Sequence, residues 1–173
     1  MSELRSRIQE CVYHNPGIHF NELGRTLDIA TGQTQHHLRR LQQTDRVKRE
    51  AVCGRTHYFP PTYSAWERGA IALLRRETTR EIVGYLLRNE REHPGDLADQ
   101  LEIARSTVEW HLSNLIEYDL VEKTHITRDG TDRIVVEVTE PDAVYRLLRE
   151  IEPGFTDRLV DRFTRLADEL LAE

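Results

Sequence analysis

Apolar positions at helical spacing predict two short helices, joined by a tight turn, near the N-terminus. The first helix is expected to begin at Asn21 and to bury Leu23 and Leu27, which lie four residues apart. The second helix is expected over about residues 32–43, with Thr31 as its N-cap. The buried face of this second helix carries Thr34, Leu38 and Leu41. Two helices joined in this way form a helix-turn-helix unit.

The same pattern returns 74 residues later in the chain. Residues 21–49 align without a gap to residues 95–123, and nine of the 29 pairs are identical. The identical pairs are Leu23/Leu97, Leu27/Leu101, Ile29/Ile103, Ala30/Ala104, His37/His111, Leu38/Leu112, Leu41/Leu115, Asp45/Asp119 and Val47/Val121. Most of them are apolar, as expected when a duplicated fold keeps its core. One fold therefore occurs twice.

Each copy is followed by a predicted β-hairpin and preceded by an amphipathic helix. The β-prone runs are residues 47–51 and 56–59 in the first copy, and residues 121–126 and 133–138 in the second. Gly54 and Gly130 lie between these runs, which is a hairpin signal. The preceding helices are expected over residues 4–13 and about 79–87. Three helices followed by a hairpin, twice over, predict a tandem winged helix.

The expected fold class is mainly α with small β-hairpin wings (α+β). We expect a first winged helix-turn-helix domain over residues 1–62, a helical linker over 63–78, a second such domain over 79–140 and a C-terminal helical segment over 141–173. In the linker, residues 65–76 are expected to be helical, with Ile71 and Leu74 spaced for burial.

A single apolar stripe runs along the end of the chain. It consists of Phe155, Leu159, Phe163, Leu166 and Leu170, at spacings of four, four, three and four. Such a helix can fold back on its own domain or pair with its twin. Because regulators that bind two half-sites need a two-fold axis, we favour dimerisation into a homodimer.

Charge is distributed unevenly between the two copies. The whole chain carries a net charge of -6, but residues 1–62 hold nine Arg/Lys against six Asp/Glu. Residues 95–140 hold four Arg/Lys against eleven Asp/Glu. This asymmetry indicates different functions for the two halves, and the acidic second half fits a protein partner.

The first copy has the residues that DNA recognition requires. Glutamine and arginine side chains on its second helix suit base edges, while the helix N-terminus and the basic hairpin suit phosphates. The predicted DNA-binding residues in this copy are Thr31, Gln33, Gln35, His36, Arg39, Arg40, Arg46, Lys48, Arg49 and Arg55. We therefore expect double-stranded DNA as the partner of this copy.

The second copy is expected to serve mainly as scaffold or interface. Arg105, Ser106 and Thr107 at the start of its second helix are suited to one phosphate. Carboxylates follow them along the helix and the hairpin, and these would repel a phosphate chain. Trp110 is expected to pack against the linker or a partner subunit.

The chain resembles the tandem winged-helix transcription regulators of halophilic archaea. The resemblance is carried by PGIHFNELGRTLDIATGQTQHHLRRL and GRTHYFPP in the first half, and by RRETTREIVGYLL, ARSTVEWHLSNLIE and DRFTRLADELL in the second. More distantly, each unit resembles the ArsR and MarR groups of repressors. The resemblance implies a sequence-specific DNA-binding regulator.

Other functions are less well supported by the residues. A metal sensor could draw on His14, His19, His36, His57, Cys11 and Cys53. The one close-spaced pair is His36-His37, whose side chains diverge on a helix, so we expect no metal and no cofactor. His37 and His111 occupy one repeat position, which favours a structural role. There is no phosphate-binding glycine loop, nucleophile elbow or HExxH motif, so we expect no enzyme.

Two further expectations complete the sequence-based prediction. No uncharged apolar run of about 18 residues is present and the first residues are charged, so we expect a cytoplasmic protein without membrane contact. An alternative function remains open: tandem winged helices also serve as protein-binding adaptors in chromosome complexes and among general transcription factors.

Overall fold

A computed structural model describes residues 1–151 and divides the chain into two units, Met1–Ala72 and the part from Leu73 onward. Within the described residues there are eight helices and two three-stranded antiparallel sheets, an α+β architecture. The predicted fold class is therefore confirmed. The residues of the predicted dimerisation stripe, from Phe155 to Leu170, lie outside the described part of the chain.

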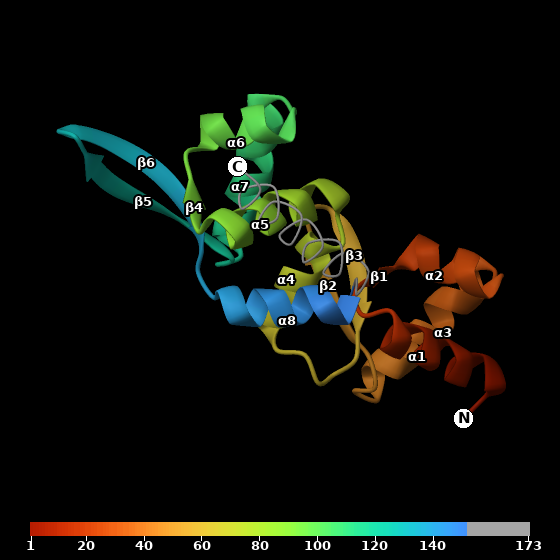
Figure 1. Ribbon diagram of the computed structural model, residues 1–173. Coiled ribbons are helices and arrows are strands. Elements are labelled where there is room, and N and C mark those ends of the chain that lie inside the picture. Colours follow the sequence, from red (N-terminus) through yellow and green to blue (C-terminus); the bar gives the residue numbers. More distant parts are fainter. Residues whose placement is uncertain (152–173) are drawn as a thin grey trace, which may run out of the picture. The chain divides into compact units, whose positions relative to one another are not determined.

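The first unit is a three-helix winged helix (Figure 1). Its elements are α1 (Glu3–His14), β1 (Ile18–His19), α2 (Phe20–Leu27), α3 (Thr31–Gln43), β2 (Lys48–Val52) and β3 (Arg55–Phe59), and α4 (Ala65–Leu74) follows. The strand order is β1-β3-β2, with Ile18 opposite Tyr58 and Lys48 opposite Phe59. The two-residue strand β1 therefore joins the start of α2 to the wing.

One apolar cluster holds the first unit together. It contains the buried residues Ile8, Cys11, Val12, Ile18, Leu23, Leu38, Leu41, Val47 and Tyr58. These residues come from α1, α2, α3, β1, β3 and the residue before β2, so the three helices and the sheet share one core. Burial of each large aliphatic side chain stabilises the fold by about 1.5–3 kcal/mol. The predicted inner face of α3 is confirmed, because Thr34, Leu38 and Leu41 are all buried.

The helix starts differ from the prediction. Helix α2 begins at Phe20 with His19 as its N-cap, not at Asn21. The backbone N–H of His19 donates to Glu22 Oε2 over 3.5 Å, which gives the cap an acidic partner in the first turn. Helix α3 includes Thr31, and its N-cap is Ala30, whose side chain has no hydrogen-bonding group. The expected capping role of Thr31 was therefore wrong.

The second unit repeats the same order of elements and adds a helix. Its elements are α5 (Glu77–Asn89), β4 (Arg91–Glu92), α6 (Pro94–Leu101), α7 (Arg105–Glu117), β5 (Val121–Arg128), β6 (Thr131–Val138) and α8 (Pro141–Ile151). The strand order is β4-β6-β5. Val108, Leu112 and Leu115 of α7 are buried, at the positions of Thr34, Leu38 and Leu41.

Residues 74 positions apart also share backbone conformations. Asp28 and Glu102, which end α2 and α6, both adopt the left-handed conformation, with φ of 52° and 55°. Asp45 and Asp119 after the following helices also have positive φ. Asp tolerates this region better than most residues because its short side chain can hydrogen-bond locally. The internal repeat predicted from the sequence is therefore a structural repeat.

Each wing turns through two residues. Cys53 and Gly54 have φ of 49° and 74°, and Asp129 and Gly130 have φ of 53° and 73°. Positive φ at both central residues is the geometry of a type I′ hairpin turn, whose twist matches the flanking strands. Arg55 and Arg128 therefore belong to strands rather than to the turns. The strands of the second wing are eight residues long, against five in the first.

Helix α4 confirms the helix expected at the start of the linker, although it ends at Leu74 rather than at Arg76. Ile71 and Leu74 are buried, as their spacing predicts. Among the helices described for residues 1–151, none has the length and apolar character needed to cross a membrane.

Candidate nucleic-acid interface

The surface side of α3 presents the side chains that the sequence predicted for DNA contact. Thr31, Gln33, Gln35, His36, Arg39 and Arg40 are all exposed. They remain exposed because the helix is anchored from its other side. Thr34 is fully buried there, and its hydroxyl donates to the carbonyl oxygen of Ala30 over 3.1 Å. An exposed polar side on a rigidly packed helix is the arrangement that reads base edges in a major groove.

A groove lies between α3 and the wing of the first unit. It has a volume of about 820 Å³. The residues that line it are His19, Phe20, Asn21, Glu22, Arg25, Gln35, Leu38, Arg39, Gln42, Arg49, Gly54, Arg55, Thr56 and Tyr58. Four of these are arginines and one is a carboxylate, so the groove is strongly cationic. A concave cationic surface concentrates the field that attracts a phosphate chain.

Strand alternation directs Arg49 into this groove. Arg49 is paired with Tyr58 in the sheet, so their side chains lie on the same face. Burial raises the pKa of Tyr58 above its usual value, and the charge and hydrogen bond of Arg49 oppose that shift. Arg49 is therefore held beside the Tyr58 hydroxyl on the groove wall.

Lys48 does not belong to the same surface. Its neighbour Arg49 faces the groove, and consecutive strand residues point to opposite faces. The Lys48 ammonium lies 2.8 Å from Asp45 Oδ1, and this contact lowers the pKa of Asp45. Glu50, two residues further and on the same face as Lys48, accepts from Arg68 Nε over 2.9 Å. Of the predicted wing cations, Lys48 thus faces away from the groove and lies beside a carboxylate.

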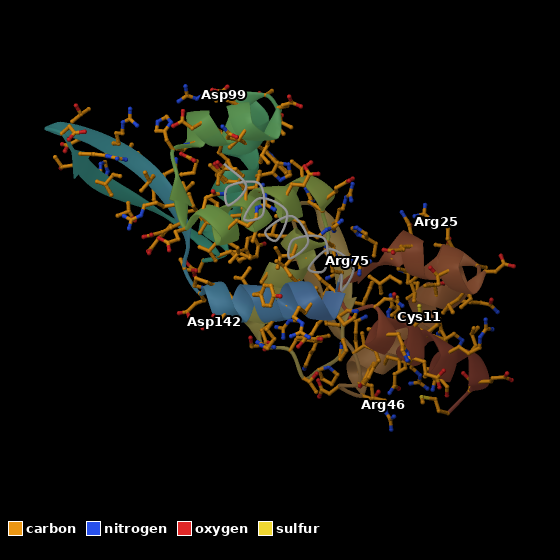
Figure 2. The ribbon with its side chains drawn as sticks, viewed as in Figure 1. Cys11, Arg25, Arg46, Arg75, Asp99 and Asp142 are labelled. Carbon is orange, nitrogen blue, oxygen red and sulfur yellow. The ribbon has the colours of Figure 1, made fainter. Side chains whose placement is uncertain are left out.

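A second group of cations lies on another side of α3. Arg40, Gln43 and Thr44 line a smaller depression together with Met1, Arg5 and Arg46. At 100° per residue, its α3 residues, Arg40 and Gln43, lie about 120° around the helix from those that line the groove. Figure 2 shows Arg25 and Arg46 well apart on the first unit. The predicted arginines of the first copy therefore form two clusters.

Two arginines of these clusters were absent from the sequence-based prediction. Arg25 is the last basic residue of α2 and lines the groove, while Arg5 of α1 lines the second depression. Their positions depend on how α2 and α1 cross α3, which local spacing does not specify. The repeat alignment held one clue to Arg25, because its counterpart in the acidic copy is Asp99.

The corresponding surface of the second unit has a different chemistry. Arg105 and Ser106 are exposed and Thr107 is half-buried, at the start of α7. Further along α7, Glu109 lies 3.7 Å from Lys123 of β5, so this acidic residue has a basic partner. The second unit therefore offers one short polar group at a helix N-terminus rather than a basic groove.

Trp110 occupies the position of His36 in the second unit. Its ring is 49% exposed, and the Arg76 guanidinium lies 5.2 Å from the ring centre. Arg76 is the N-cap residue of α5, in the predicted linker segment. The expectation that Trp110 contacts the linker is confirmed, through a cation–π contact rather than through a helix face.

The histidines and cysteines of the metal alternative come from several elements of the first unit. Within residues 1–151, no three His, Cys, Asp or Glu side chains come together in a way that could hold a metal ion. Cys11 is buried in the core, where burial raises its pKa, and both cysteines are free thiols. His111 Nδ1 lies 2.9 Å from the Thr79 hydroxyl oxygen, which supports the structural role expected for that residue.

Comparison with known proteins matches both units. Residues 2–71 match a family model described as an N-terminal HTH domain, and residues 75–122 match one described as winged helix-turn-helix DNA-binding. The chain is also similar to an uncharacterized HTH-type transcriptional regulator of Methanocaldococcus jannaschii, with 26% identity over 140 residues, or 81% of this chain. The match covers 34% of that protein, so the chain spans about a third of the length of its curated relative.

Among solved structures, the similarities are more distant. A transcriptional regulator homologue from Pyrococcus horikoshii has 20% identity and a TM-score of 0.43, over 53% of this chain and 95% of that one. MarR from E. coli has 14% identity and a TM-score of 0.41, over 62% of this chain and 86% of that one.

The two family models divide the chain at the same place as the structural repeat. Each model covers one unit, and the two together extend from the first residues to the start of β5. The tandem organisation and the archaeal resemblance expected from the sequence are confirmed. The chain thus consists of two tandem helix-turn-helix domains and is similar to an archaeal HTH-type transcriptional regulator.

Proposed function

We propose that this protein is a sequence-specific regulator of transcription that binds double-stranded DNA mainly through its first unit. The observation that carries the proposal is the basic groove beside the exposed side of α3, which brings Arg25, Arg39, Arg49 and Arg55 together. In this arrangement α3 lies in the major groove, and its glutamines and arginines read base edges. Catalysis has no part in the proposal.

The two basic clusters suit the two phosphate strands that border a major groove. The groove cluster holds one strand, through Arg25, Arg49 and Arg55. The cluster of Arg5, Arg40 and Arg46 holds the other. Between them the exposed side of α3 carries Gln35, His36 and Arg39 toward the bases. Contacts with phosphates fix the register of the protein on the duplex, and contacts with bases select the sequence.

The second unit acts mainly as scaffold or interface in this proposal. Its α7 carries Glu109 and Ser113 at the positions of Gln35 and Arg39, which removes both base-reading and phosphate-binding groups. Arg105, Ser106 and Thr107 keep the option of one phosphate contact at the helix N-terminus.

The protein is further proposed to act as a homodimer through its last residues. The stripe of Phe155, Leu159, Phe163, Leu166 and Leu170 supports this from the sequence alone. Removal of residues 155–173 is expected to give monomers in sedimentation equilibrium. A truncated chain that still sediments as a dimer would place the interface elsewhere.

The function is tested first by pull-down of fragmented genomic DNA at two salt concentrations, followed by footprinting. Recovery of a few discrete, two-fold symmetric sites supports a sequence-specific dimer. The recovered site then serves as probe for Arg39→Ala, Arg55→Ala and Arg128→Ala. The first two variants are expected to weaken binding about tenfold or more, or about 1.4 kcal/mol, while Arg128→Ala in the second wing has a smaller effect. Equal losses in all three would contradict the assignment of the first unit as reading head.

The adaptor function is the second candidate, because the second unit is acidic where the first is basic. Asp99, Glu109 and Glu122 replace Arg25, Gln35 and Lys48. Salt distinguishes the two candidates. Each phosphate contact steepens the dependence of log affinity on log salt by about 0.9, so a regulator loses affinity steeply as salt rises. An adaptor is expected to bind duplex DNA weakly at every salt concentration.

A further inference from the structure

We propose that His19 takes up a proton when duplex DNA enters the basic groove and thereby becomes an additional cation of that surface. This inference rests on the proposed function, because it needs a phosphate chain in the groove. His19 was not among the residues that the sequence predicted for DNA contact. It lies at the N-terminus of α2 and lines the groove, beside the wing arginine Arg55.

The contact between His19 and Arg55 indicates the role of one ring nitrogen of His19. Arg55 Nη1 lies 3.4 Å from His19 Nε2. A guanidinium has only donors, so the hydrogen bond requires a lone pair on Nε2. In this contact Nε2 is therefore the unprotonated nitrogen, and it accepts from the wing arginine.

The ring of His19 packs against the buried ring of His57. The ring centres of His19 and His57 are 4.4 Å apart. His57 is 1% exposed, and its Nδ1 lies 2.7 Å from the carbonyl oxygen of Gly17. Because a carbonyl only accepts, this Nδ1 carries the proton and His57 has a fixed orientation. The β1–β3 pairing, which places His19 opposite His57, keeps the two rings together.

The charges around His19 explain why DNA would change its protonation. Helix α2 contributes Glu22 and Arg25, α3 contributes Arg39, β2 contributes Arg49, and β3 contributes Arg55 and His57. Apart from Glu22, the charged groups here are arginines, which disfavour a further positive charge in the free protein. A phosphate in the groove adds negative charge beside the ring, which favours a positive charge on His19. The phosphate oxygens also accept the hydrogen bonds that Arg55 donates. Nε2 is then released, takes up a proton from the solvent and can donate to a phosphate oxygen.

The consequence is a DNA affinity that rises as the pH falls through the range where histidine titrates, around 6.5. Uptake of one proton on binding changes affinity by at most about tenfold per pH unit. His36, which is exposed on α3, can also take up a proton when DNA binds. The contribution of His19 therefore has to be isolated by comparison of variants.

The second unit offers a matched control. His93 lies 74 residues after His19 and is likewise the N-cap of its helix, α6. Its Nδ1 accepts a hydrogen bond from the backbone N–H of Gly95 over 3.1 Å. A substitution at His93 therefore perturbs a capping histidine in the unit that is not proposed to read DNA.

The experiment measures affinity by fluorescence anisotropy from about pH 8 to about pH 6 at constant ionic strength. The probe is a labelled mixed-sequence duplex of about 30 base pairs, close to three helical turns. The proteins are the wild type, His19→Gln, His36→Gln, the double variant with both substitutions, and His93→Gln, each checked for folding by circular dichroism. We expect His19→Gln to bind with a flatter pH profile than the wild type, by up to about tenfold per pH unit. His93→Gln is expected to keep the wild-type profile, and His36→Gln to remain steeper than His19→Gln combined with His36→Gln.

A second readout reports on His19 directly. In the wild type, the Cε1–H resonance of His19 in NMR is expected to titrate at a higher pH with the duplex than without it. A histidine that serves only as a helix cap would show the same titration with and without the duplex. Binding with an identical pH profile in wild type and His19→Gln, together with an unmoved resonance, would overturn the inference and leave the proposed function intact. Absence of duplex binding at every pH would overturn the proposed function and the inference with it.

Discussion

The two units share a backbone and differ in their surfaces. Leucines at 38 and 112, and at 41 and 115, are buried in equivalent helices, and the left-handed residues after those helices also coincide. Outside the core, Arg25 is replaced by Asp99 and Arg39 by Ser113. Figure 2 shows Arg25 on α2 and Asp99 on α6, the corresponding helices of the two units. Packing restricts the inner positions of a duplicated fold, while the outer positions are free to acquire different functions.

The wings differ in size as well as in charge. The second wing has eight-residue strands, and its β5–β6 ribbon extends beyond the short strand β4 (Figure 1). Its two arginines, Arg128 and Arg133, lie on one face of the ribbon, because Arg133 pairs with Ile126 and Arg128 with Thr131. The Thr127 hydroxyl donates to Asp132 on the opposite face over 2.6 Å. The acidic character of the second copy is therefore not uniform over its wing.

The largest effect is expected where the two units are most alike. Leu38→Ala and Leu112→Ala each remove a fully buried leucine at the same repeat position. Each is expected to lower the free energy of unfolding of its own unit by about 2–5 kcal/mol, through lost burial and an unfilled cavity. Hydrogen exchange followed by mass spectrometry resolves the two units along the chain. The conservative Leu38→Met and Leu112→Met serve as controls and are expected to cost less than about 1.5 kcal/mol. A cost below about 1 kcal/mol at either leucine would mean that the two cores are not equivalent.

An exchange of charges between the units is expected to have an intermediate effect. The variant Arg25→Asp, Gln35→Glu, Arg39→Ser gives the first unit the residues of the second. It is expected to lose at least about a hundredfold in affinity for duplex DNA, because two cations are lost and two carboxylates face the phosphates. Anisotropy with the same mixed-sequence duplex measures the loss.

The reverse exchange sharpens the same comparison. Asp99→Arg, Glu109→Gln, Ser113→Arg gives the second unit the residues of the first. Its affinity is expected to rise about tenfold at low salt, with a steeper salt dependence. If this variant folds normally and gains nothing, charge is not what separates the units, and the shape of the α7 surface around Trp110 is the cause instead.

The sequence predicted the repeat, the helix pairs and the hairpins because each depends on local spacing and turn residues. It missed the N-caps His19 and Ala30, since neither residue is a preferred N-cap. It did not specify how the predicted cations of the first unit are divided between surfaces. The alternation of β2 separates Lys48 from Arg49, and the helical period separates Arg40 from Arg39. Arg25 and Arg5 joined the clusters only through the crossing of α2 and α1 with α3, which is a tertiary property.

The smallest effect is expected at Trp110, where the second recognition helix is already engaged within the protein. The Arg76 guanidinium lies over its ring, and His111 meets the ring edge with centres 4.8 Å apart. Replacement by the first unit's residue, Trp110→His, is expected to cost about 0.5–1 kcal/mol through loss of the cation–π contact. A double-mutant cycle with Arg76→Gln, followed by chemical denaturation, isolates that coupling from the other contacts of each side chain. A coupling energy near zero would mean that the contact with Arg76 does not hold Trp110 in place. The α7 surface would then be as accessible as that of α3, and the division of labour between the units would rest on charge alone.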